Sequence, residues 1–206
     1  MVRSVTIAVL AATVLQSGCA PLVVGAAAVG TVMVASDRRP ADVQLADQRI
    51  ELQAGQRVGS LVKDDGHVNI TSYNKQALVT GETRTEALKQ EVERTVAGIA
   101  EVRGVVNEIQ VAPLASLSSR TNDTRLTGVV KGKFLDDAKF SPLYVKVVTE
   151  SGVVYLLGIV THKEADDATN IARHVSGVKR VVRVFDYIPE PPAQAQTQTP
   201  ASEAAK

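Results

Sequence analysis

The 206-residue sequence contains no tryptophan, and aromatic residues make up only 3% of it. A chain with so few aromatic side chains offers no stacking platform for single-stranded nucleic acid. The formal net charge is +1, which is too small to indicate a protein that binds polyanions. We therefore predict no nucleic-acid partner, and hydrophobic cores built mainly from Val, Leu, Ile and Ala.

The sequence also lacks the motifs of catalytic and metal sites. Its three histidines, His67, His162 and His174, have neither the i, i+4 spacing nor the cysteine neighbours that a zinc site requires. Adjacent aspartates on a turn or helix point apart and cannot serve as a separated acid and base, which applies to Asp64-Asp65, Asp136-Asp137 and Asp166-Asp167. No P-loop, Gly-x-Ser-x-Gly or dinucleotide-binding motif is present. We predict no enzyme activity, no cofactor and no metal site.

The only cysteine, Cys19, stands at the end of a segment typical of export signals. Arg3 precedes an apolar run over residues 5–15, and small residues follow that run. A cysteine at this place is typical of the lipid-attachment residue of bacterial lipoproteins, whose several acyl chains anchor the protein firmly. We predict a signal peptide over residues 1–18 and lipid attachment at Cys19. A plain secretory signal with an incidental cysteine and an uncleaved anchor are the alternatives.

Two further segments flank the part of the chain that is expected to fold. Residues 22–35 are apolar, but fourteen residues are short for a spanning helix, which needs about 20. We predict a lipidated stalk over residues 19–42. Residues 189–206 are rich in Pro, Gln, Ala and Thr without apolar periodicity, and this composition predicts a disordered tail.

Between these segments the chain repeats one layout. Residues 68–81 and 145–158 each open on valine and close on glycine at equal spacing, and both predict a β-hairpin. Thr-x-x-Glu follows each hairpin, at residues 83–86 and 161–164, and this capping-box spacing predicts the start of a helix. After each helix, a β-branched run predicts a third strand.

An amphipathic helix is predicted before each hairpin. Ile50, Ala54 and Val58 lie at i, i+4 and i+8, and the same spacing recurs at Leu126, Val130 and Phe134. The cap-type residues Asn122, Asp123 and Thr124 are expected to begin the second of these helices. The unit is therefore α-β-β-α-β, present twice, which predicts an α+β fold with domains at residues 43–112 and 123–188 and a linker at 113–122.

The two copies differ in charge. Residues 43–112 carry eight Lys/Arg against ten Asp/Glu, a net of −2, whereas residues 120–188 carry eleven against eight, a net of +3. The second copy is therefore the better candidate for an anionic surface. In its first helix, Arg125, Gly128, Gly132 and Leu135 lie opposite the core stripe, and Lys131 and Lys133 lie on its flanks. We predict that these six residues contact phospholipid. An ordinary solvated helix face is the alternative.

Residues 153–160 form an unbroken apolar run, so both faces of this strand carry large side chains. An antiparallel strand with one wet face should alternate instead. Two helices can cover only one face of a three-stranded sheet. We therefore predict that Val154 and Leu156, or their neighbours of opposite parity, pack against the first copy or against a protein partner.

The repeated pattern resembles the BON domain. The sharpest stretches are Asn170-Ile-Ala-Arg-His-Val-Ser-Gly-Val-Lys-Arg-Val-Val182, Ser72-Tyr73 and Val106-Asn-Glu-Ile109. Two such copies behind a lipoprotein signal resemble the dual-BON outer-membrane lipoproteins of the DolP type. The resemblance implies, for each copy, a three-stranded sheet with two helices on one face.

The resemblance also implies a function and a location. A protein of this type would be lipid-anchored in the outer membrane, face the periplasm, bind anionic phospholipid through a BON domain and support outer-membrane integrity. The competing interpretation is a structural or chaperone-like adaptor that recognises envelope proteins. Such an adaptor would have no lipid binding beyond its acyl anchor.

Overall fold

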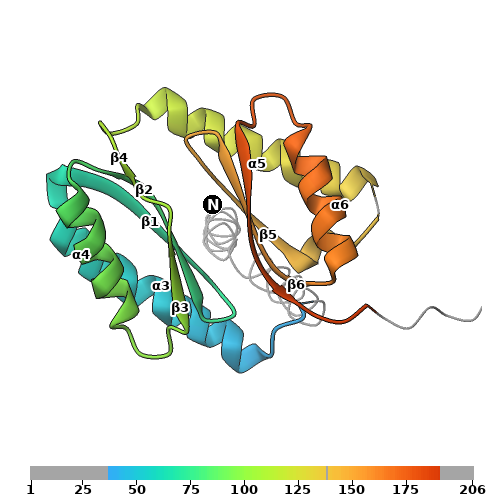
Figure 1. The fold of residues 1–206 in the computed structure, drawn as a ribbon, viewed down its shortest axis with the longest axis horizontal. Helices are drawn as coiled ribbons and strands as arrows, with labels where there is room; N and C mark the ends of the chain where they lie inside the picture. The colour runs from blue at the N-terminus through green and yellow to red at the C-terminus, as the bar shows by residue number, and fades with distance from the viewer. Residues whose placement is uncertain (1–36, 138, 191–206) are drawn as a thin grey trace, which may run out of the picture.

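This computed structural model describes residues 37–137 and 139–190 (Figure 1). The predicted signal peptide, the lipid-attachment residue Cys19, most of the stalk and nearly all of the tail lie outside these residues. The described chain forms two α-β-β-α-β units in tandem, as predicted. Among its helices, none is both long and apolar enough to cross a membrane.

The first unit has a sheet in the order β1-β2-β3, in which β1 is antiparallel to β2 and the third strand is parallel to it. The third strand is broken, and its second piece, β4, also pairs with β2. The elements are α3 (Ala41–Val62), a 3-10 turn (Lys63–Asp65), β1 (Gly66–Tyr73), β2 (Gln76–Thr83), α4 (Glu86–Ala97), β3 (Gly104–Asn107) and β4 (Gln110–Val111).

The second unit repeats this topology with an unbroken third strand. Its sheet has the order β5-β6-β7, with β5 antiparallel and β7 parallel to the central strand β6. The elements are α5 (Leu117–Asp137), the 3-10 helix η3 (Pro142–Tyr144), β5 (Val145–Glu150), β6 (Val153–Val160), α6 (His162–Arg173) and β7 (Arg180–Tyr187).

Both predicted hairpins are confirmed, and so is their repeated valine and glycine. Val68 lies opposite Gly81 in the first hairpin, and Val145 lies opposite Gly158 in the second. A Cβ atom at Gly81 would collide with the carbonyl oxygen of His67, and one at Gly158 with that of Tyr144. Glycine recurs at this point because the neighbouring backbone comes too close for any side chain.

A buried aspartate of the first helix holds the turn of each hairpin. Residues 74–75 and 151–152 have φ angles of 52° and 63°, and of 51° and 79°, as the two central residues of a type I′ turn require. Asp47 of α3 accepts both amides of the first turn, and Asp123 of α5 accepts both amides of the second, at 2.7 to 2.8 Å. These carboxylates satisfy donors that would otherwise lack a partner.

The predicted capping boxes differ in outcome. Thr161 caps α6 and exchanges hydrogen bonds with Glu164, which confirms the second box. The first box is wrong, because Thr83 is still the last residue of β2, where it pairs with Gly66. The helix α4 begins three residues later, and the hydroxyl of Thr85 accepts the amide of Leu88 at 3.2 Å.

The start of α5 also differs from the prediction. The helix begins at Leu117, so that the last residues of the segment predicted as a linker, 113–122, are helical. The residues expected as its cap lie inside it. Asp123 turns inward to the hairpin turn instead of capping an end, while the hydroxyl of Ser116 accepts the amide of Ser119 at 3.3 Å.

Each unit has its own hydrophobic core between its sheet and its two helices. The predicted helical stripes belong to these cores, because their residues, Ile50, Ala54, Val58, Leu126, Val130 and Phe134, are at most 1% exposed. A third hydrophobic cluster lies between the two sheets, and we name it the seam. Its buried residues are Tyr73, Leu78, Val153, Tyr155, Leu157 and Val184.

One face of the strand β6 belongs to a core and the other face belongs to the seam. The residues that face the seam are the neighbours of those predicted from the sequence. Val154 and Leu156 lie in the core of the second unit, because α5 and α6 cover the face to which they point. Val153, Tyr155 and Leu157 face the first unit. Packing against the first copy is therefore right, but the assignment of Val154 and Leu156 to it is wrong.

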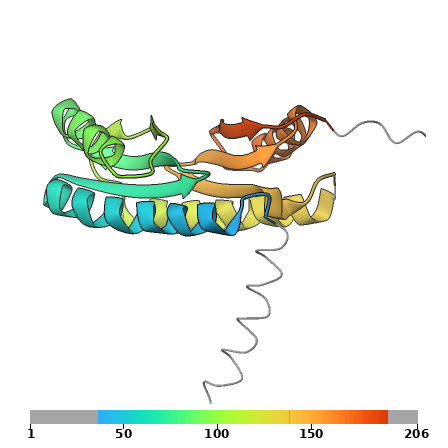
Figure 2. The same cartoon turned by 90° about the horizontal axis from the view of Figure 1, so that it is seen from below.

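The two units present their first helices on the same side of the molecule. Figure 2 shows α3 and α5 in one layer and α4 and α6 in a second layer, although both helices of a unit cover the same face of its sheet. Polar contacts across the seam fix this arrangement, and they include Lys146 to Glu51 at 2.9 Å, Arg103 to Asp186 at 2.7 Å and Arg180 to Glu108 at 2.9 Å.

Candidate functional site

The outer face of α5 is free of large side chains along its middle. Leu126, Val130 and Phe134 point into the core, and Gly128 and Gly132 lie on the opposite side of the helix. A Cβ atom at either glycine would meet nothing within 4 Å. A flat surface could therefore approach the backbone of this helix closely.

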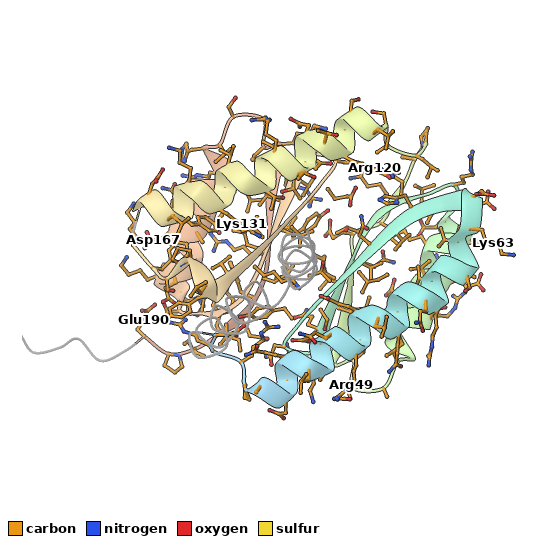
Figure 3. All side chains as sticks on the ribbon, turned by 180° about the vertical axis from the view of Figure 1, so that it is seen from behind. Arg49, Lys63, Arg120, Lys131, Asp167 and Glu190 are labelled. Carbon is orange, nitrogen blue, oxygen red and sulfur yellow. The ribbon has the colours of Figure 1, made fainter. Side chains whose placement is uncertain are left out.

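Three cations surround these glycines. Arg125, Lys131 and Lys133 are exposed, and Figure 3 shows Lys131 on this side of the molecule. The Nζ of Lys133 lies 3.9 Å from Asp136, and this is the only ion pair that any of the three makes within the described residues. Arg125 contacts the neutral side chain of Asn122 at 3.1 Å. Most of this positive charge is thus available to an external anion.

An apolar groove adjoins the C-terminal half of α5. It has a volume of about 430 Å³, and the exposed side chains of Leu135 and Leu143 line it. These leucines are 69% and 43% exposed, and because both line one groove they form a shared apolar surface. Lys131 also lines the groove, so a cation stands beside an apolar surface.

The structure brings together most, but not all, of the residues predicted for this surface. Lys131 and Leu135 share the apolar groove, while Gly128 and Gly132 form the open outer face. Lys133 lies on the other flank, in a second groove between α5 and α6 that Asn170 and His174 also line.

Sequence reasoning missed Pro142 and Leu143, which complete the apolar groove from η3. This turn follows α5 and has no periodicity that could connect it with the helix. Asp37 and Arg39 also line the groove. Their place there depends on contacts with distant residues, which the sequence does not reveal.

Two successive arginines tie the start of the described chain to both units. Arg38 binds both carboxylate oxygens of Glu164 at 2.6 and 2.8 Å and the carbonyl of Ile159 at 2.8 Å, and its guanidinium lies 3.7 Å from the centre of the Tyr144 ring. Arg39 binds Asp47 at 2.7 Å. The segment before α3 is thus held against the second unit.

These contacts change the acidity of Glu164. Burial alone would raise its pKa, but the hydrogen bonds from Arg38 and from the Thr161 amide outweigh burial and hold the pKa below the ordinary value. The carboxylate stays ionised at neutral pH. It therefore accepts hydrogen bonds both within the capping box of α6 and from Arg38 in the segment before α3.

A polar cavity of about 290 Å³ lies at the opposite end of the seam, lined by His67, Asp123 and Glu150 among others. Burial raises the pKa of Glu150, and the hydrogen bond from Asn69 opposes this. Protein groups already occupy these carboxylates, because Asp123 holds the hairpin turn and Glu150 accepts from Asn69. The described residues contain no group of three or more His, Cys, Asp or Glu side chains that could hold a metal ion.

The other two histidines have ordinary partners. The ring of His162 stacks on Tyr187 with 4.2 Å between ring centres. A ring nitrogen of His174 lies 2.6 Å from the carbonyl oxygen of Asn170.

The outer face of α5 with its apolar groove is therefore the strongest candidate site.

Comparison with known proteins agrees with this architecture. The BON domain model matches residues 46–113 and 122–189. The outer membrane lipoprotein DolP of Haemophilus influenzae is 36% identical over 87% of this chain and 93% of that protein. A 21 kDa hemolysin of Actinobacillus pleuropneumoniae is 29% identical over 74% of this chain and 79% of that protein.

More distant relatives match a smaller part. The osmotically-inducible protein Y of Escherichia coli is 31% identical over 55% of this chain and 58% of that protein. A solved structure of CdsD, from the type III secretion system of Chlamydia trachomatis, aligns at 13% identity over 66% of this chain and 92% of that one, with a TM-score of 0.28. That likeness is too weak to add to the argument. The two family matches and the near full-length identity to DolP establish that the chain belongs to the BON domain family, as a dual-BON outer-membrane lipoprotein of the DolP type.

Proposed function

We propose that this lipoprotein is acylated at Cys19, faces the periplasm, binds anionic phospholipid through the outer face of α5 and thereby supports the integrity of the outer membrane. The observation that carries the proposal is the combination of open glycine backbone, exposed cations and an adjoining apolar groove along one helix. Headgroup phosphates would bind the cations, and acyl chains would meet Leu135 and Leu143.

The magnitudes fit a surface that binds a membrane weakly by itself. Each basic side chain near an anionic bilayer contributes about 1 kcal/mol. Full burial of a leucine side chain contributes roughly 1.5 to 3 kcal/mol. The lipid anchor would add to this, because it keeps the domain pair at a high effective concentration near the bilayer.

The length of the tether is compatible with this contact. Seventeen residues separate Cys19 from Asp37, and even fully extended they span only about 60 Å. Asp37 lines the same groove as Leu135. The surface of α5 therefore lies within reach of the membrane to which Cys19 would be attached.

Vesicle flotation tests the lipid contact. Residues 37–190 contain both cores and the seam, so this fragment is expected to fold without the segments on either side. It should float with vesicles that contain phosphatidylglycerol and remain behind with vesicles of phosphatidylcholine alone. The double variant Arg125→Glu, Lys131→Glu should lose at least roughly thirtyfold in affinity, given about 1 kcal/mol for each lost cation.

A matched control carries the same change of charge on α6. Lys163→Glu with Arg173→Glu alters two exposed cations of the same domain on the other side of the molecule. This variant should bind nearly as well as the parent. If the fragment floated equally well without phosphatidylglycerol, or if both variants reduced flotation equally, the proposal would be overturned and the adaptor role would be favoured.

The anchor is tested separately. Mass spectrometry of the membrane-extracted protein should find a mature N-terminus at Cys19 that carries a diacylglyceryl group and an amide-linked acyl chain. An unmodified cysteine, or a retained signal segment, would contradict acylation without bearing on the surface of α5.

A further inference from the structure

Helix α3 carries two exposed leucines on the side of the molecule that also carries α5. Leu45 and Leu52 are 55% and 63% exposed. They are seven residues apart, which is two helical turns or about 10.5 Å, so they lie on one line along the helix. This line is opposite the core stripe that contains Ile50 and Ala54.

The repeat gives these leucines a comparison within the same chain. Ile50 of α3 corresponds to Leu126 of α5 as the first residue of the core stripe, so Leu52 corresponds to Gly128. At the same place in the two domains, one helix therefore presents a large apolar side chain and the other presents bare backbone. The two helices therefore differ in chemistry at this position, while both lie on the same side of the molecule (Figure 2).

We propose that α3 is a second membrane-contacting helix, with Leu45 and Leu52 inserted among the acyl chains while α5 binds the headgroups. This rests on the proposed lipid binding by α5 and extends it to the first domain. The cations of α5 and the apolar positions of α3 and the groove would then form one bipartite surface on the side of the molecule where α3 and α5 both lie, which is the near side in Figure 3.

Three observations favour a bilayer over a protein partner on α3. Its exposed charged residues are a single acid, Asp42, and two cations, of which Arg49 pairs with Glu101 at 3.0 Å and Arg57 makes no ion pair within the described residues. Its first turn begins four residues after Asp37, at the point where the chain leaves toward Cys19. The apolar line is only two side chains long, far below the roughly 800 Å² per partner that a stable dimer buries.

Spin labels at single cysteines test this directly, because the fragment of residues 37–190 contains no native cysteine. Labels are placed by Leu52→Cys on α3, by Leu135→Cys on α5, and by Val111→Cys as a control. Val111 is 47% exposed on β4, which packs beside α4. With phosphatidylglycerol vesicles, the labels at 52 and 135 should become more accessible to oxygen than to a water-soluble nickel chelate. The label at 111 should show the reverse.

The outcomes separate this inference from the proposed function. A label at 135 that enters the bilayer while the label at 52 stays in water would overturn the role of α3 and leave that of α5 intact. If neither label enters, both proposals fail. A label at 52 that is already shielded without vesicles would indicate a second copy on α3 and would also overturn the inference.

An affinity measurement supports the same test without labels. The double variant Leu45→Ser, Leu52→Ser should bind phosphatidylglycerol vesicles roughly tenfold more weakly or worse, because two apolar side chains no longer leave water. Val111→Ser should bind like the parent. Equal binding by all three proteins would overturn the role of α3.

Discussion

The two BON domains of this chain keep the same interior and differ at their surfaces. In both, a glycine admits close backbone contact across the hairpin, and an aspartate of the first helix binds the amides of a type I′ turn. Outside these features they diverge. The third strand is broken in the first domain and continuous in the second, and only α6 has a full capping box.

This difference shows which parts of the repeat the fold requires. Turn geometry and core stripes are preserved because a change there leaves a buried donor without a partner or a cavity in the core. The outer faces of α3 and α5 carry no such constraint. Both carry open glycines and exposed cations, but α3 presents Leu52 at the position where α5 presents Gly128.

The largest effect is expected at the seam, which couples the two domains. Leu156 and Leu157 are both fully buried, but the first lies in the core of one domain and the second in the seam. Leu157→Ala should cost about 2 to 5 kcal/mol. It should also separate the unfolding of the domains into two calorimetric transitions, whereas Leu156→Ala should lower the stability of the second domain mainly. A single transition in both variants would contradict separate roles for the two positions.

A smaller loss is expected at the aspartates that hold the turns. Asp47→Ala and Asp123→Ala should each cost about 2 to 3 kcal/mol, because two turn amides lose a charged acceptor. Asp47 also binds Arg39 and Ser72, so its replacement should cost more than that of Asp123. Urea unfolding measures both, with the exposed Asp136→Ala as the control. Values near those of the control would show that the shared turn contact does not stabilise the repeat.

The segment before α3, which Arg38 holds against the second domain, has no counterpart in that domain. Loss of its contacts should have a more modest effect on stability. Arg38→Ala removes the bidentate pair with Glu164 and the bond to the carbonyl of Ile159. We expect a loss of about 1.5 to 3 kcal/mol, the range for a hydrogen bond to a charged group. Thermal unfolding of residues 37–190 measures it, and Arg57→Ala on the exposed side of α3 is the control. An unchanged melting temperature would contradict the role of Arg38.

The smallest effect concerns two carboxyl groups that should respond to pH in opposite directions. The pKa of Glu164 is lowered in the folded state, so its contribution to stability is present above its ordinary value of 4.5 and is lost as the pH falls through the folded pKa. Burial raises the pKa of Glu150 in the folded state. The folded protein therefore loses stability as the pH rises from the ordinary value of 4.5 through the raised pKa, because the buried carboxyl group must then ionise. Urea unfolding across pH should show that Glu164→Gln removes part of the acid-side loss. Glu150→Gln should remove part of the stability loss that occurs as the pH rises. If both variants changed the pH dependence of stability in the same direction, these assignments would be contradicted.

Local patterns predicted most of the fold. The core stripes at i, i+4 and i+8 and the hairpins were predicted correctly because their periodicity is a property of neighbouring residues. The start of α5 was misplaced because Asp123 has the chemistry of a helix cap but binds the hairpin turn instead. Likewise, Thr83 matched a capping box but continues β2.

The candidate site was predictable in part for the same reason. The outward direction of Gly128 and Gly132 follows from the helical period of α5, whereas Lys131 and Lys133 lie in separate grooves on its two flanks. The apolar groove could not be predicted, because Leu143 and Arg39 reach it from a turn and from the other domain. The sequence could not show which alternate residues of β6 face the core, because this depends on which face of the sheet the helices cover.

The central claim is that α5 contacts the anionic bilayer and α6 does not. It is tested most directly by NMR of residues 37–190 bound to phosphatidylglycerol nanodiscs that contain a spin-labelled lipid headgroup. The account predicts that amide signals broaden most along α5, around Gly128 and Gly132, while those of α6 around Ala168 and Ala172 persist. Broadening centred on α6, or broadening spread evenly over both helices, would contradict it.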